Sequence, residues 1–319
     1  MSSVTGIHHI TAISGDAQEN LDFYVGVLGL RLVKKSINQD APDTYHLFFA
    51  DAEGNPGTDI TFFPWPNMPA GRLGPGVWGE VQLGIPEGTM EFWQERLNQH
   101  GVAVGESELR FGEATLPFSD PHGMHLSLVE APLYEGFGFT PWDNSPVDAD
   151  KQIRALAGAR LPERDSTATR AFLENALGMQ RLGEEAGWTR YGLGGGEAGR
   201  RIDIRDEPGT PGGGWGVGSV HHVAWRVKDE AHQSELREKI VAAGVSPTQV
   251  IDRFWFKSIY VREPGGALFE VATDGPGFAV DEDPAHLGET LVLPPFFEAQ
   301  RAQIETLLPP LGPPRKAAL

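Results

Sequence analysis

The sequence predicts an α+β fold of four βαβββ modules arranged in two domains, and three observations support this prediction. First, a helical segment that ends at a glycine occurs four times, and successive glycines are 72, 77 and 66 residues apart. Second, one strand-like stretch precedes each helical segment and several follow it. Third, 40% of the 319 residues are hydrophobic, which suffices for two packed domains of ordinary size.

The four predicted helices carry apolar residues at helical spacing. In the first of them Leu21, Tyr24 and Leu28 fall on one face, and Gly29 follows. Glycine at that place is typical of a left-handed helix cap. The four helical segments with their terminating glycines are 19–33, 89–104, 166–181 and 229–245.

Strands are predicted on both sides of each helix. The stretches before the helices are 7–13, 77–85, 152–159 and 218–227. In each module, the last strand follows a glycine-containing turn, at 55–58, 121–124, 197–200 and 264–267. Each module is therefore a strand, a helix and three strands.

An offset of 143 residues relates the second and fourth modules without a gap. At this offset identical residues are paired, among them Val77 with Val220, Gly101 with Gly244, Arg110 with Arg253, Phe111 with Phe254, and Pro121 with Pro264. The pattern favours internal duplication over the alternative, a common supersecondary unit used four times without common descent.

A stretch rich in Pro, Gly and aromatic residues, 131–150, separates the second module from the third. We therefore predict an N-terminal domain at 1–135, a linker at 136–150 and a C-terminal domain at 151–275. A tail follows at 276–319, and its segment 296–308 is expected to form a short helix.

Composition excludes several classes of protein. Cysteine is absent, so disulfides, zinc fingers, iron–sulfur ligation and thiol nucleophiles are excluded. A net charge of −18 with few basic stretches argues against nucleic acid as a partner. No apolar run is long enough to span a membrane, and the first residues do not resemble a signal peptide. We expect a cytoplasmic enzyme or binding protein, and the sequence leaves its oligomeric state open, a homo-oligomer included.

Two histidine pairs, His8-His9 and His221-His222, each lie in the first strand of a module. Neighbouring side chains in a strand point to opposite faces, so one histidine of each pair is expected to enter a shared site. In 220–227 the face with His221, Val223, Trp225 and Val227 is the more apolar, and it should pack beneath a helix. The face with Val220, His222, Ala224 and Arg226 is the better candidate for a ligand-holding surface.

A carboxylate at Glu270 lies in the apolar strand 267–272, where it is costly unless it is paired or binds a metal. If the preceding turn is symmetric about Gly265, Tyr260 lies directly opposite Glu270. Arg253 falls on the preceding strand or its approach.

Comparison of the modules predicts one complete site. The first and fourth modules supply His9, Thr61, His222 and Glu270 at four equivalent positions. The second and third supply Gly79, Ser127, no histidine, and Asp203. Two histidines and one carboxylate are the ligand set of non-haem Fe(II) oxygen chemistry, with open positions left on the metal. The alternatives are structural histidines and a Glu270 that pairs with Arg253 or Arg262.

The sequence resembles the vicinal oxygen chelate superfamily, and within it the dioxygenases that cleave the ring of hydroquinones, including the chlorohydroquinone and methylhydroquinone enzymes. The resemblance runs nearly end to end. It rests on IHHITAISGDAQENLDFYVGVLGLRLVKKS from Ile7, YHLFFADAEGNPGT from Tyr45, HHVAWRV from His221, SIYVREPGGALFEVATDGPGF from Ser258, and DEDPAHLGETLVLPP from Asp281.

The resemblance implies that paired modules form open β-cups, and that Fe(II), with Mn(II) as the alternative, is held by His9, His222 and Glu270. It also implies contacts to substrate or ligands from His8, Thr11, His221, Arg253 and Tyr260. The implied reaction inserts both atoms of O2 into a small aromatic substrate and gives a ring-opened semialdehyde acid. An extradiol catechol dioxygenase, a glyoxalase-like isomerase and a metal-free protein that binds aromatic compounds are the alternatives. Strand alternation predicts that His8 and His221 point away from the metal.

Overall fold

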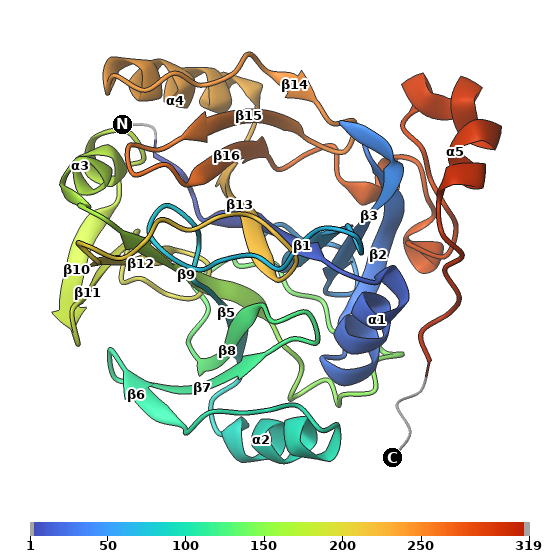
Figure 1. Cartoon of the computed structure of the whole chain (residues 1–319), viewed down its shortest axis with the longest axis horizontal. Helices are drawn as coiled ribbons and strands as arrows, with labels where there is room; N and C mark the ends of the chain where they lie inside the picture. Colours follow the sequence, from blue (N-terminus) through green and yellow to red (C-terminus); the bar gives the residue numbers. More distant parts are fainter. Residues whose placement is uncertain (1–2, 316–319) are drawn as a thin grey trace.

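Two curled sheets of eight strands each form the body of the protein in a computed structural model that describes residues 3–315 (Figure 1). In the first sheet the strand order is β14-β15-β16-β13-β1-β4-β3-β2. Its strands are β1 (Ile7–Ser14), β2 (Arg31–Asn38), β3 (Ala41–Ala50), β4 (Asp59–Pro64), β13 (Ser219–Val227), β14 (Ile251–Asp252), β15 (Lys257–Arg262) and β16 (Leu268–Thr273).

The second sheet has the order β10-β11-β12-β9-β5-β8-β7-β6, which matches the first position by position. Its strands are β5 (Glu80–Ile85), β6 (Glu108–Arg110), β7 (Glu113–Ser119), β8 (His125–Glu130), β9 (Ala155–Glu163), β10 (Gln180–Glu185), β11 (Trp188–Gly192) and β12 (Arg201–Asp206). The predicted α+β class and its four modules are thereby confirmed.

The modules pair crosswise. The first module joins the fourth through antiparallel β1 and β13, and the second joins the third through antiparallel β5 and β9. Each sheet therefore takes one module from each side of the segment 136–150. The domain division at that segment stays a prediction.

The helices lie on the outside of the sheets, with α4 beside β14–β16 and α2 beside β6 and β7 (Figure 1). They are α1 (Ala17–Leu21), which continues into a π-helical segment (Asp22–Val27), α2 (Met90–Gln99), α3 (Thr167–Asn175) and α4 (Glu230–Ala242). All four predicted terminating glycines have positive φ, between 70° and 81°. Glycine is needed there because a Cβ disfavours that conformation.

The main core lies between the sheets and their helices. Ile10, Val223, Trp225, Phe269 and Val271 are each completely buried in it. A second apolar cluster lies on the opposite face of the first sheet and includes Phe48, Trp255, Phe256 and Phe278. Burial of one such side chain is worth about 1.5–3 kcal/mol, so both faces of this sheet contribute to stability.

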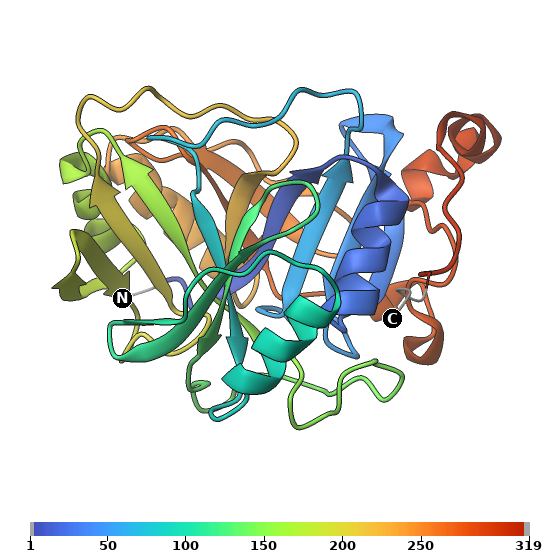
Figure 2. The same ribbon diagram turned by 60° about the horizontal axis from the view of Figure 1, so that its bottom comes forward.

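The tail packs along the β2 edge of the first sheet (Figures 1 and 2). It contains short 3₁₀ turns, among them Phe278–Val280, Pro284–His286 and Pro295–Gln300, and then α5 (Arg301–Leu307). The predicted helix at 296–308 is thus part 3₁₀ and part α. The completely buried Lys34 anchors the tail, because its Nζ lies 2.7 Å from Asp281 Oδ1 and also contacts Glu282.

Two buried carboxyl groups, Glu163 of β9 and Glu263, meet where the third module contacts the fourth. Glu263 accepts hydrogen bonds from Thr169 Oγ1 at 2.6 Å and from two backbone N–H groups at 2.8 Å. Glu163 is 1% exposed, and burial together with the neighbouring Glu263 raises its pKa to about 9. Glu163 is therefore protonated where it lies beside Glu263.

No helix among residues 3–315 combines the length and the apolar character needed to cross a membrane.

Candidate metal centre

Three potential ligands converge on the concave face of the first sheet. His9 comes from β1, His222 from β13 and Glu270 from β16, and all three are at least 97% buried. His9 Nε2 lies 3.3 Å from His222 Nε2 and 3.4 Å from Glu270 Oε2, and the third edge of the triangle is 2.8 Å. Within the described part of the chain this is the one group of three such residues whose ligand atoms lie within 4.8 Å of one another.

The local register explains this convergence. Thr11 pairs with His222 across β1 and β13, and Ala224 pairs with Glu270 across β13 and β16. His222, Ala224 and Glu270 therefore share one face, while Val223 and Phe269 occupy the core face. The sequence-based assignment of His222 to the ligand face is confirmed.

His8 and His221 correct the prediction from strand alternation. Each is an extra residue in a β-bulge, at the two register shifts between β1 and β13. A bulge turns two consecutive side chains toward the same side. The Nδ1 atoms of His8 and His9 are therefore 2.9 Å apart, and those of His221 and His222 are 2.8 Å apart.

The second bulge also corrects the assignment of strand faces. Val220, which we predicted on the ligand face, is in the main core together with Val223. His221, predicted beneath a helix, instead stacks on Trp215 with ring centroids 4.2 Å apart. A period of two cannot hold across an inserted residue.

The hydrogen bonds of His8 leave a lone pair of His9 directed at the site. His8 Nε2 lies 3.1 Å from the carbonyl oxygen of Thr273, which can only accept, so this nitrogen carries the proton. Burial lowers the pKa of His8 to about 3, so the ring is neutral and its Nδ1 is an acceptor. His9 Nδ1 must then donate to it, and His9 Nε2 is free to bind a metal.

The three residues fit a divalent metal. Among the described residues none donates a well-aligned hydrogen bond to Glu270 Oε2, although this oxygen is buried, whereas Oε1 accepts from Ser258. Burial alone would raise the pKa of Glu270, but His9 and His222 lower it well below its ordinary value, so the carboxylate is ionised. Ligands at right angles about 2.1 Å from an ion are about 3 Å apart, close to the three separations seen.

Thr61 occupies the fourth equivalent position, as predicted. Its Oγ1 donates to Thr11 Oγ1 at 2.8 Å and lies 2.8 Å from His46 Nε2. Thr61 and Thr11 are completely buried. A fourth carboxylate or imidazole ligand is thus replaced by a hydroxyl that is already hydrogen-bonded.

Tyr260 lies directly opposite Glu270 across β15 and β16, as expected from the symmetric turn. Arg253 donates from Nε to the Tyr260 hydroxyl at 3.3 Å and from Nη2 to Asp40 Oδ2 at 2.8 Å. Burial and the nearby Glu270 raise the pKa of Tyr260. The phenol therefore stays protonated and is able to donate a hydrogen bond.

A cavity that is partly open to solvent lies beside the three ligands. Its walls combine aromatic rings with polar groups, supplied by His9, Asn38, Gln39, Asp40, His46, Phe48, Phe63, His222, Arg253, Trp255, Phe256 and Tyr260. Aromatic walls with a few polar groups are typical of a site that binds a small aromatic ligand. Of the predicted residues outside the metal ligands, Arg253 and Tyr260 reach this cavity, whereas His8, Thr11 and His221 are not among its walls.

His46 is a site residue that sequence analysis missed. Burial, together with His9 and His222, lowers its pKa well below the ordinary value, so a neutral imidazole faces the cavity. The alternation of residues 45–50 could have revealed His46, because His46, Phe48 and Ala50 alternate with the core residues Tyr45, Leu47 and Phe49. Phe48 pairs with Thr61, which places that face at the site.

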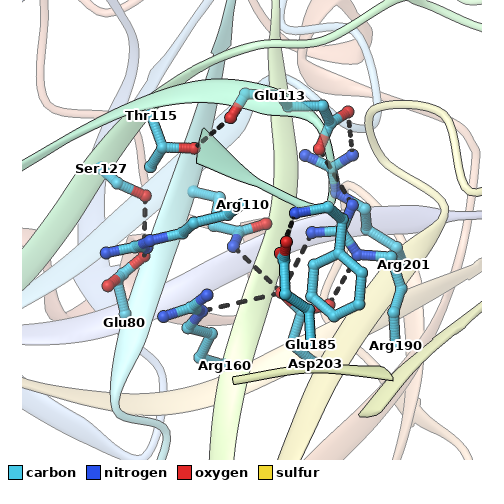
Figure 3. A network of polar contacts seen from close by, with 12 residues as sticks. Glu80, Arg110, Glu113, Thr115, Ser127, Arg160, Glu185, Arg190, Arg201 and Asp203 are labelled. Carbon is cyan, nitrogen blue, oxygen red and sulfur yellow. Dashed lines mark hydrogen bonds and ion pairs between the residues drawn. The ribbon is translucent and has the colours of Figure 1, made fainter. Parts of the chain in front are cut away.

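The second sheet holds ion pairs at the corresponding place (Figure 3). In the strand register, Glu80 lies opposite Arg160, just as His222 lies opposite Thr11 in the first sheet. Glu80 therefore takes the place of His222. Our alignment to Gly79 was wrong by one residue, because Glu80 in β5 and His222 in β13 are offset by 142 residues rather than 143. Gly158 takes the place of His9, and Ser127 and Asp203 stand where predicted.

Arginines neutralise the carboxylates of this second cup. Arg190 binds Asp203 with Nε–Oδ1 at 2.8 Å, and Arg110 binds Glu80 at 2.6 Å (Figure 3). Arg201, Arg160 and Glu113 complete the network. A divalent cation would meet four guanidinium groups here, so the second cup is unsuited to a metal.

The fold and the site together define a class of protein: paired βαβββ modules that form one cup with a His–His–Glu metal-binding set and a second cup filled by ion pairs. The model of the Glyoxalase/Bleomycin resistance protein/Dioxygenase superfamily matches residues 6–128 and 155–271. The chain belongs to this superfamily.

Relatives cover nearly the whole chain. MhqO of Bacillus subtilis (strain 168), which carries a provisional assignment as a ring-cleaving dioxygenase, is 46% identical over 96% of this chain and 96% of its own. The chlorohydroquinone/hydroquinone 1,2-dioxygenase of Sphingobium indicum is 36% identical over 94% of this chain and 95% of its own.

Solved structures agree with the fold. A provisionally assigned dioxygenase from Bacillus subtilis subsp. subtilis str. 168 has a TM-score of 0.91 and 44% identity, and covers 98% of this chain and 99% of its own. Glyoxalase I from Zea mays has a TM-score of 0.64 at 15% identity, over 84% of this chain and 92% of its own, which shows the shared fold alone.

Proposed function

We propose that this protein is an Fe(II)-dependent dioxygenase that cleaves the ring of hydroquinones, including chlorinated and methylated ones. The observation that carries the proposal is the His9–His222–Glu270 set beside an aromatic-walled cavity. The relative named as a chlorohydroquinone/hydroquinone 1,2-dioxygenase supports this substrate class.

The proposed overall reaction combines one hydroquinone with one O2. The bond between a hydroxyl-bearing ring carbon and its neighbour breaks, and both oxygen atoms remain in the ring-opened semialdehyde acid. A ferrous ion held by the three ligands would supply the chemistry that makes O2 reactive toward a phenol and would hold both reactants.

The residues of the cavity take on binding and proton handling. Phe48, Phe63, Trp255 and Phe256 hold the ring and exclude water. The Tyr260 hydroxyl, hydrogen-bonded to Arg253, donates a hydrogen bond to substrate oxygen, and Arg253 stabilises negative charge that develops there. Neutral His46 Nε2 contacts Thr61, and we propose that its ring orients the substrate.

His8, His221 and Thr11 act through other residues. His8 and His221 hold the Nδ1 atoms of the two histidine ligands, and this contact orients the ligand rings. Thr11 anchors Thr61 and His46 through hydroxyl contacts. We propose these three as positioning residues rather than groups that touch substrate.

The alternatives differ in what they require. A glyoxalase-like isomerase normally has four protein ligands, and Thr61 stands at the fourth position. A metal-free binding protein has no need of an ionised, buried Glu270 between two imidazoles. An extradiol catechol dioxygenase shares the ligand set and differs in requiring adjacent hydroxyls.

The test is turnover under isotopically labelled O2. Protein purified anaerobically and loaded with Fe(II) is mixed with methylhydroquinone, hydroquinone or catechol, and the products are analysed by mass spectrometry. We expect hydroquinone-type substrates to give a ring-opened product that contains both labelled atoms. Preference for catechol would contradict the proposed substrate class, and product without label would contradict a dioxygenase.

A further inference from the structure

The cavity contains one pair of fully charged side chains. Among the described residues of its walls, Asp40 and Arg253 are the only members of the Asp, Glu, Lys and Arg types. The other walls are aromatic rings, side-chain amides and histidines. Apart from the metal-binding set, the charge that a substrate substituent meets in this cavity is therefore set by these two residues.

The pair joins the first module to the fourth at the wall of the cavity. Asp40 follows β2 in the first module, and Arg253 precedes β15 in the fourth. Arg253 Nη2 donates to Asp40 Oδ2 at 2.8 Å, and the side chains are 14% and 75% exposed, respectively. Gln39 Nε2 also donates to the carbonyl oxygen of Arg253 at 2.9 Å, so the same two loops are joined twice.

Among the described residues of the second cup, the arginine equivalent to Arg253 has no carboxylate partner from the other module. Arg110 is the equivalent of Arg253 there, and its partners Glu80 and Glu108 come from its own module. Arg253 instead takes its carboxylate partner, Asp40, from the first module, which forms the same sheet.

We propose that Asp40 is a specificity residue that excludes hydroquinones with a ring-borne carboxylate, because it already pairs with Arg253, the one cationic side chain among the described walls of the cavity. The inference rests on the proposed function and narrows its substrate class to rings with uncharged substituents.

The physical reason is the cost of an unpaired charge. A carboxylate on the ring would either lie against aromatic walls without a counter-ion or compete with Asp40 for Arg253. In both cases Asp40 adds like-charge repulsion, which disfavours the wrong ligand. Methyl and chloro substituents carry no such cost and suit walls such as Phe48 and Phe63.

The experiment compares (2,5-dihydroxyphenyl)acetate with its amide, which has the same shape and no charge. For the Fe(II)-loaded wild type we expect kcat/KM to favour the amide by at least about tenfold, a typical effect of one charge at a partly exposed site. Asp40→Asn should reduce this preference by about tenfold. In the double variant with Asp40→Asn and Arg253→Gln, the improvement in kcat/KM for the carboxylate that Asp40→Asn alone gives should be lost.

Asp43→Asn is the matched control, because Asp43 is exposed on β3, outside the cavity walls, and its change removes the same charge. Equal preferences in the wild type and Asp40→Asn, or the same shift in Asp43→Asn, would overturn the inference. Anaerobic dissociation constants of both compounds for the metal-loaded protein give the same ratio without turnover. If no diphenol is consumed, the proposed function fails, and these constants still decide the role of Asp40.

Discussion

Glu163→Gln tests the buried carboxyl pair at the contact between the third and fourth modules. The pKa of Glu163 is raised to about 9 in the folded chain from an ordinary value of 4.5. The folded state therefore binds a proton that the unfolded state releases. The stabilisation is fully present below pH 4.5 and is lost as the pH rises toward about 9.

The expected size of this pH effect on the free energy of unfolding follows from the binding of one proton. Between pH 6 and 8 the free energy of unfolding of the wild type should fall by about 1.4 kcal/mol per pH unit because of this group, so by roughly 2.7 kcal/mol in total. Glutamine does not titrate, and its amide N–H can donate to Glu263 in place of the carboxyl proton. The variant should lack this part of the pH dependence.

The assay is denaturant unfolding at pH 6, 7 and 8, with exposed Glu238→Gln on α4 as the control of equal charge change. The wild type and the control should share the steeper pH dependence. Parallel curves for Glu163→Gln and the wild type would refute the assignment of a protonated Glu163.

Four further predictions concern the cups and the tail. Glu270→Gln should lower Fe(II) retention and dioxygenase activity together, measured by metal analysis and O2 uptake, and full activity with normal iron would defeat the ligand assignment. Asp203→Asn should cost about 3 kcal/mol of folding stability, because Arg190 and Arg160 lose their buried partner, while iron content stays unchanged. Lys34→Met should leave Asp281 and Glu282 without their cation, and so speed hydrogen exchange in 276–289. Unchanged exchange there would show that the clamp is dispensable. Asp40→Asn should weaken discrimination against carboxylated rings, as read from the ratio of the two kcat/KM values.

Repeat periodicity was enough to predict the modules, the glycine-ended helices and the pairing of His9, His222 and Glu270 in one cup. These features follow from local rules that act the same way in all four modules. The opposed Tyr260 and Glu270 also followed from counting around a short hairpin turn.

The errors arose where a single residue breaks a period. The bulges at His8 and His221 are invisible to alternation, and they reversed the expected directions of both side chains. The alignment of Glu80 was also wrong by one residue, because the offset between the second and fourth modules is not constant. His46 and Asp40 were missed because their roles depend on contacts between segments far apart in the chain, Asp40 with Arg253 at a separation of 213 residues.

The most direct test of the central claim is iron stoichiometry together with hydroquinone-dependent O2 uptake on the same anaerobically loaded sample. The proposed site predicts one Fe(II) per chain and O2 consumption that starts when methylhydroquinone is added and yields a ring-opened product. Absence of bound metal after loading, or bound iron without O2 uptake on any hydroquinone, would contradict it.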